Sequence, residues 1–107
     1  WQLITAPADG KDVLAVGSVN RNRVRVASSS KGPTADGRIK PDVAAMGAST
    51  AVVFPSGTIG TSSGTSFAAP LITSLVSVLW QANPELSNIQ LMDAIRRSAS
   101  QSATPDN

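Results

Sequence analysis

Ser66 is the residue of this chain best placed to do chemistry. It lies in Gly64-Thr65-Ser66-Phe67-Ala68-Ala69-Pro70, directly before an apolar segment that runs from Leu71 to Trp80. A serine at the start of a helix is well placed to be a nucleophile. The helix dipole and the free N–H groups of the first turn stabilise the negative charge that develops during acyl transfer. The local sequence therefore makes Ser66 a candidate nucleophile.

The chain lacks the base that such a nucleophile needs. Its 107 residues contain no histidine, and a seryl hydroxyl without an imidazole beside it is a poor nucleophile at neutral pH. The sequence thus carries half of an active site. The plain alternative for Ser66 is a helix N-cap, a position that serine often takes.

Two other serines match short catalytic patterns. Ser62, in Gly60-Thr61-Ser62-Ser63-Gly64, fits the nucleophile elbow of α/β-hydrolases. In that class the acid and the base follow the serine, yet no histidine follows Ser62. Residues 28–31 read Ser-Ser-Ser-Lys and match the Ser-x-x-Lys of penicillin-recognising enzymes, which place it at a helix start. A Gly-Pro pair follows here, so we interpret that match as chance.

The composition is that of one globular domain with few special features. Apolar residues make up 41% of the chain, and there is no cysteine, which excludes disulfides and thiolate metal sites. We see no converging carboxylates, and we expect neither a metal ion nor a cofactor. No apolar run approaches the roughly eighteen residues of a membrane span, so we expect no membrane partner.

The formal charge is only +2, and the one basic cluster is local. Arg21, Arg23 and Arg25 alternate with period two, which predicts that they share one face of a strand. We predict a strand at residues 23–28 in this region. A solvated strand face is the favoured interpretation. Nucleic-acid binding is the alternative, and no interleaved aromatic residue supports it.

The remaining elements alternate between strands and helices. We predict further short strands at residues 12–19, 40–47 and 50–54, then a helix from about Ser66 to Gln81. A second helix should begin at Ser87, with Gln90 three residues on as its capping-box partner. Its predicted apolar stripe and its basic last turn comprise Ile89, Met92, Ile95, Arg96 and Arg97.

The first helix is apolar around most of its circumference, so we expect it to be buried on most sides. Four short strands and one amphipathic helix supply only part of that cover. The pattern as a whole predicts an α/β layer from which some covering structure is missing.

Four blocks of the chain resemble the subtilisin-like serine proteases. They are residues 12–19 (DVLAVGSV), 28–33 (SSSKGP), 40–47 (KPDVAAMG) and 64–70 (GTSFAAP), in the order found in that family. The resemblance implies a partial three-layer α/β sandwich, with a mainly parallel sheet and a buried helix that starts at the nucleophile. It also implies a serine endopeptidase whose triad runs Asp, His, Ser along the chain.

Carried over to this sequence, the family assigns Ser66 as the nucleophile and its N–H as one oxyanion donor. Gly64 and Thr65 beside it are then expected to contact substrate. The family's aspartate, histidine and oxyanion-hole asparagine lie upstream of residue 12 and would precede Trp1. Two residues depart from the family pattern, Met46 for a proline and Leu71 for a histidine that is not the triad base.

The resemblance therefore implies that residues 1–107 are a C-terminal fragment of a peptidase domain, inactive alone. Its expected partners are a polypeptide substrate and the missing N-terminal part of the domain, and self-association is possible for the fragment. The family implies a secreted, periplasmic or cell-surface protein. The alternative is a non-catalytic subtilase-like interaction or scaffold domain whose triad has decayed.

Overall fold

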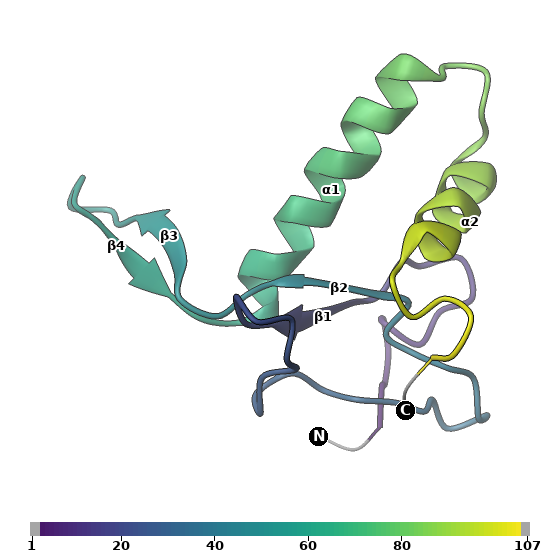
Figure 1. Ribbon diagram of the computed structural model, residues 1–107, viewed down its shortest axis with the longest axis horizontal. Helices are drawn as coiled ribbons and strands as arrows, with labels where there is room; N and C mark the ends of the chain where they lie inside the picture. Colours follow the sequence, from purple (N-terminus) through teal and green to yellow (C-terminus); the bar gives the residue numbers. More distant parts are fainter. Residues whose placement is uncertain (1–2, 106–107) are drawn as a thin grey trace.

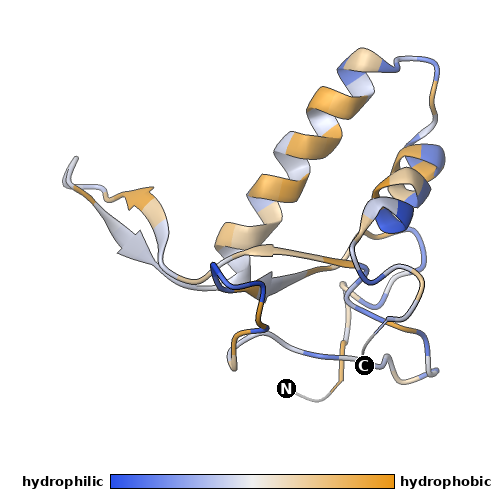
Figure 2. Ribbon diagram, viewed as in Figure 1, coloured by the Kyte–Doolittle hydropathy of each residue, from blue (hydrophilic) through white to orange (hydrophobic). Residues whose placement is uncertain are grey.

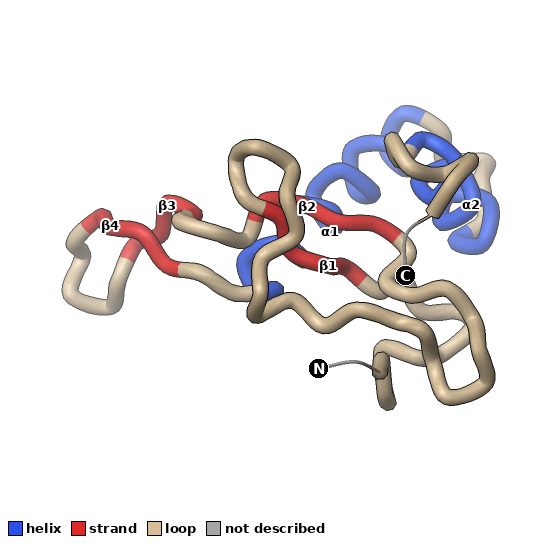
Figure 3. Tube along the Cα trace, turned by 60° about the horizontal axis from the view of Figure 1, so that its bottom comes forward, coloured by secondary structure: helices blue, strands red, loops and turns tan. Residues whose placement is uncertain are grey.

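The computed structural model describes residues 3–105 and contains four short strands followed by two helices (Figure 1). The elements are β1 (Val16–Val19), β2 (Val43–Met46), β3 (Thr50–Val53), β4 (Ile59–Ser62), α1 (Thr65–Ala82) and α2 (Asn88–Ser98). Long loops without regular structure fill the region before β1 and the region between β1 and β2 (Figure 3).

The centre of the fold is a parallel pair of strands covered by a helix. β1 pairs with β2 in parallel, from Val16 opposite Val43 to Val19 opposite Met46. α1 packs against both strands, and α2 packs against α1 (Figure 1). This arrangement of helix on parallel strands confirms the α/β class.

β3 and β4 form a separate antiparallel hairpin that projects from the body of the molecule (Figure 1). Its register runs from Thr50 opposite Ser62 to Val53 opposite Ile59. β4 was not among the predicted strands, because its glycine-rich sequence is typical of a turn. Gly60 allows the pairing, since a Cβ there would lie 2.7 Å from the ring of Phe54.

The strand predicted at residues 23–28 is wrong. The Asn20 side-chain oxygen accepts the N–H groups of Asn22 and Val24, over 2.9 and 3.0 Å, and so closes a turn. Arg23 within that turn has a positive φ of 61°, which no strand residue adopts. The segment forms only an isolated bridge between Val19 and Arg25, so the period-two arginine face does not form.

The second helix confirms its predicted cap and corrects its predicted stripe. Ser87 is the N-cap of α2, its hydroxyl accepts the Gln90 N–H, and the Gln90 side chain accepts the Ser87 N–H over 2.8 Å. The buried residues of α2 are Leu91 and Ile95, whereas Ile89 is 48% exposed. The stripe therefore begins at Leu91, and Ile89 lies to one side of it.

The first helix is much less buried than its sequence predicts. Ala68 is its single buried residue, while Leu71, Leu75 and Val78 are exposed along one face. Figure 2 shows apolar residues along the whole length of α1. The accessible surface of 7251 Å² also exceeds the value of about 5,600 Å² that a folded monomer of this mass has. The described residues therefore leave a broad apolar face of α1 uncovered.

α1 bears on the expectation about membrane spans. By length and composition it is able to cross a membrane, because its 18 residues have a mean hydropathy of 1.3. No uninterrupted apolar run in α1 is that long, and the average includes the serines and threonines between the apolar residues. The same property is found in the core helix of a soluble domain.

Candidate active site

Ser66 is the second residue of α1, and it is exposed. The N-cap of the helix is Gly64, which makes no side-chain cap, so the alternative of Ser66 as N-cap is wrong. The first N–H groups of any helix have no acceptor within it. Among residues 3–105, neither the hydroxyl nor the N–H of Ser66 has a hydrogen-bond partner. Both groups are therefore free to contact a ligand.

The turn before Ser66 depends on a glycine. Gly64 has φ 156° and ψ 157°, a conformation that is essentially restricted to glycine. Its N–H donates to the Gly47 carbonyl over 2.7 Å, and the Gly47 N–H donates in turn to the Val19 carbonyl over 3.0 Å. These two bonds join the start of α1 to the ends of β1 and β2.

Gly47 is required for that close approach. A Cβ at Gly47 would press against the Ser18 hydroxyl and lie 2.6 Å from the Gly64 carbonyl oxygen. Real Cβ atoms do not come so close to other atoms, so a side chain at Gly47 would push the turn away from the sheet. A second tie comes from the Ser49 N–H, which donates to the Ser63 hydroxyl over 2.9 Å.

The structure places Ser66 where α/β folds bind ligands, beyond the carboxyl ends of parallel strands. Gly64 forms the turn at that position and is half-buried, and Thr65, the first residue of α1, is exposed. A hollow of ≈ 280 Å³ lies nearby, bordered by Asn20–Asn22, Met46, Ala48 and Ser49. An exposed serine hydroxyl and a free N–H thus lie together at this position, and the 107 residues contain no histidine to act as a base.

The rival serines lie in settings that do not fit their patterns. Ser62 is the last residue of β4, paired with Thr50 in the antiparallel hairpin. A nucleophile elbow instead places its serine on a sharp turn from strand to helix. Ser28 lies in a turn and not at a helix start, as Ser-x-x-Lys would require. Within residues 3–105, no group of three His, Cys, Asp or Glu side chains could hold a metal ion.

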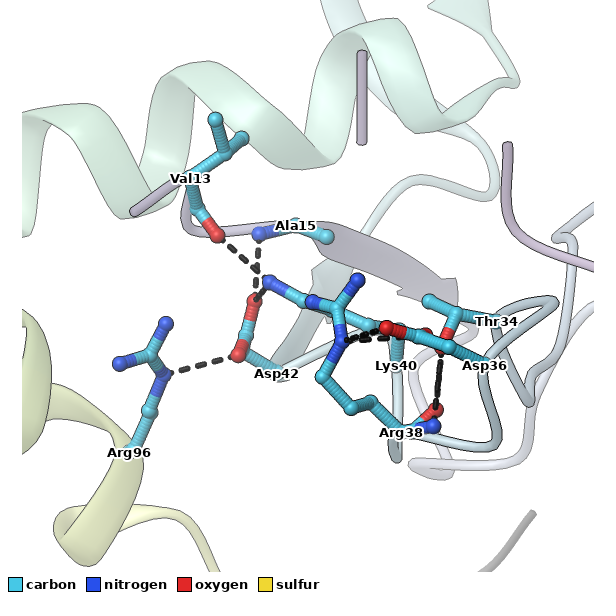
Figure 4. A network of polar contacts seen from close by, with 8 residues as sticks. All are labelled: Val13, Ala15, Thr34, Asp36, Arg38, Lys40, Asp42 and Arg96. Atoms are coloured by element: carbon cyan, nitrogen blue, oxygen red, sulfur yellow. Dashed lines mark hydrogen bonds and ion pairs between the residues drawn. The ribbon is translucent and has the colours of Figure 1, made fainter. Parts of the chain in front are cut away.

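A buried ionic cluster lies at the opposite ends of β1 and β2, and sequence reasoning missed it (Figure 4). The side chains of Lys40 and Asp42 are only 4% and 7% exposed, with Nζ 2.7 Å from Oδ2. The Lys40 ammonium also donates to the Val13 carbonyl over 2.6 Å. Arg96 of α2 donates from Nε to the other carboxylate oxygen over 2.8 Å. The cluster ties α2 to the sheet, and its signal was the charged pair that flanks Pro41.

A second, exposed pair lies in the loop before β2. The Arg38 Nε donates to both carboxylate oxygens of Asp36, and the Thr34 hydroxyl donates to one of them. The hydrogen bond from Arg38, followed by that from Thr34, lowers the pKa of Asp36 to about 2. Asp36 is therefore ionised at neutral pH.

Comparisons with known proteins agree with the resemblance. The subtilase family (peptidase S8) matches residues 2–107. Subtilisin E of Bacillus subtilis is 32% identical over 93 residues, which are 87% of this chain and 23% of that protein. The M-protease of Shouchella clausii is 28% identical over 96 residues, 90% of this chain and 24% of that protein.

A solved structure shows the same relationship. The CspB protease of Clostridium perfringens superposes with a TM-score of 0.65 and 33% sequence identity, over 71% of this chain and 17% of that one. The chain therefore belongs to the subtilase family, a family of serine proteases. It spans about a quarter of the length of these two curated relatives.

Proposed function

We propose that this chain is the nucleophile-bearing part of a subtilisin-like serine endopeptidase, with Ser66 as its nucleophile. The observation that carries the proposal is the position of Ser66. Its free hydroxyl and N–H lie at the start of α1, beyond the carboxyl ends of β1 and β2, in a member of a serine-protease family. Of the three serines that match a catalytic pattern, only Ser66 occupies a helix start.

The proposed reaction is hydrolysis of a peptide bond through an acyl-enzyme. Ser66 Oγ attacks the scissile carbonyl carbon, and a histidine takes the hydroxyl proton and passes it to the leaving amine. The Ser66 N–H donates to the oxyanion, and Gly64 and Thr65 contact the substrate. Water then attacks the acyl-enzyme with the same histidine as base, and the serine is regenerated.

The histidine, the aspartate that orients it and the oxyanion-hole asparagine are proposed to lie outside these 107 residues. Three observations support this. The chain contains no histidine. It spans 23% of Subtilisin E. The exposed face of α1 needs cover that residues 3–105 do not provide. The isolated chain is therefore proposed to be inactive, and its first partner is the rest of its own domain.

The same proposal accounts for the apolar helix. We interpret α1 as the core helix of the complete protease domain and not as a membrane span. The support is its packing, because α1 lies against both strands of the parallel pair and against α2. The proposal requires no cofactor, metal or nucleic acid. On the family resemblance we propose a secreted, periplasmic or cell-surface location.

Covalent labelling of the full-length protein tests the proposal. A fluorophosphonate probe reacts only with a serine that a neighbouring base activates. We expect one adduct per molecule, located at Ser66 by mass spectrometry, and no labelling of the isolated 107-residue chain. A Ser62→Ala variant should label normally. An adduct at Ser62 would contradict the assignment, and a full-length protein that never labels would favour a non-catalytic relative.

A further inference from the structure

Basic side chains from three segments line a hollow at the end of the sheet opposite Ser66. The hollow has a volume of ≈ 320 Å³, and its lining comprises Lys11, Arg38, Ile39, Lys40, Asp42 and Arg96. Four of these six residues are cationic and only one is acidic. They come from the segment before β1, the loop before β2 and the last turn of α2.

The single carboxylate of the hollow is fully used by its neighbours. Asp42 Oδ2 accepts the Ala15 N–H and the Lys40 ammonium, each over 2.7 Å. Its Oδ1 accepts from Arg96 Nε over 2.8 Å. The single negative charge of Asp42 is therefore shared between Lys40 and Arg96. The lining of the hollow keeps an excess of positive charge.

The two arginines are held in place by one nitrogen each. Arg38 bonds to Asp36 through Nε, over 2.8 and 3.1 Å, and Arg96 bonds to Asp42 through Nε. Among residues 3–105 the terminal Nη groups of both guanidiniums have no hydrogen-bond partner. Figure 4 shows the terminal nitrogens of Arg96 turned away from the Asp42 carboxylate. These oriented, unused donors are what an oxyanion requires.

The lining of the hollow carries an excess of positive charge. Four cations, Lys11, Arg38, Lys40 and Arg96, face one carboxylate, Asp42. Asp36 pairs with Arg38 from outside the lining. Asp9 also acts on Arg38 from a distance, but it does not line the hollow.

We propose that this hollow binds a small tetrahedral oxyanion, phosphate or sulfate, between Lys11, Arg38 and Arg96. A guanidinium presents paired N–H donors that match the oxygens of such an ion, and the lysine adds a mobile point charge. The bound ion links three segments of the fold and stabilises the folded state, because it binds the folded chain and not the unfolded one. The proposal is independent of the protease assignment.

The test uses the full-length protein carrying Ser66→Ala, so that proteolysis cannot interfere. Inorganic phosphate is titrated at pH 7.5, and sodium chloride is adjusted to hold the ionic strength constant. The midpoint temperature of thermal unfolding is measured at each phosphate concentration. We expect a saturable rise in the midpoint with phosphate or sulfate. Isothermal titration should then give one site per molecule. Lys11→Gln and Arg38→Gln should each weaken phosphate binding at least fivefold.

Arg97→Gln is the matched control, because Arg97 is the next residue of α2 but pairs with Asp93 and does not line the hollow. Its phosphate affinity should equal that of the parent. Lys11 is exposed and unbonded within residues 3–105, so Lys11→Gln stays informative if Arg38→Gln fails to fold. An effect of phosphate no larger than that of chloride would overturn the proposal. Equal shifts with acetate, or equal weakening by Arg97→Gln and Lys11→Gln, would also overturn it.

Discussion

The Gly64 N–H donates to the Gly47 carbonyl oxygen over 2.7 Å, and this bond joins the turn before Ser66 to the end of β2. Two glycines far apart in sequence thus hold the proposed nucleophile in place. Gly64 supplies a backbone conformation that other residues avoid, and Gly47 supplies the room for the close approach. The position of Ser66 therefore depends on the carboxyl end of the parallel pair as much as on the helix that contains it.

Gly47→Ala should destabilise the full-length protein by about 1–3 kcal/mol, the usual cost of forcing a methyl group into a packed site. The new Cβ would press on Ser18 and on the Gly64 carbonyl, and would displace the turn. Urea denaturation of the Ser66→Ala background measures the stability. Gly37→Asn is the control, because Gly37 has a positive φ with nothing near its Cβ and asparagine tolerates that backbone. Equal losses for both variants would contradict the packing argument.

Asp42→Asn should destabilise the protein strongly, by about 3–5 kcal/mol, because it leaves the buried Lys40 ammonium without its counter-charge. Asp93→Asn removes the carboxylate of an exposed pair with Arg97. It should cost at most about 1 kcal/mol. Chemical denaturation of the parent and of both variants measures the two losses in free energy of unfolding. If Asp42→Asn cost no more than Asp93→Asn, the cluster would not join α2 to the sheet in the way described.

The Asp36 and Arg38 pair should make stability depend on pH in the acid range. The hydrogen bond from Arg38, then that from Thr34, lowers the pKa of Asp36 from 3.8 to about 2. A lowered folded-state pKa means that the carboxylate stabilises the protein above about pH 4, and that this stabilisation is lost as the pH falls toward 2. The difference in thermal midpoint between parent and Asp36→Asn should therefore shrink over that interval. It should be small throughout, because the pair is exposed. A difference independent of pH would contradict this account.

The isolated 107-residue chain should associate with itself at micromolar concentration. The exposed face of α1, with Leu71, Leu75 and Val78, needs cover, and a second copy can provide it by edge pairing or exchange of elements. Analytical ultracentrifugation measures the mass. Leu75→Glu together with Val78→Glu should shift the population toward monomer, whereas Ser77→Glu on the polar face should not. A monomeric chain that unfolds cooperatively would show that α1 needs no further cover.

The sequence predicts best what depends on local signals. Both helices and the capping box of Ser87 and Gln90 follow from periodicity and cap residues, and the structure confirms them. The strand at residues 23–28 fails because the Asn20 side chain closes a turn, which alternation of residues cannot reveal. β4 was not predicted because its glycine-rich sequence is typical of a turn, whereas its pairing with β3 is a contact made in the folded chain.

In the candidate site, too, local features can be predicted from the sequence and contacts between distant segments cannot. Ser66 and its helix start can be read from the sequence, since glycine, serine and the apolar run are adjacent. The support from Gly47 and the buried pair of Lys40 and Asp42 depends on contacts made only in the folded chain. Burial of α1 was inferred from its own residues, whereas its actual exposure depends on what the other elements leave uncovered.

The most direct test of the central claim is the peptidase turnover of the full-length protein and its Ser66→Ala variant. Turnover should fall by about a million-fold, the loss found when the nucleophile of subtilisin is removed, with a residual rate from the oxyanion donors and binding. Ser62→Ala should retain nearly full turnover, and circular dichroism should show all three proteins folded. A fall of less than about tenfold in folded Ser66→Ala would show that Ser66 is not the nucleophile, and the account of the site would be wrong.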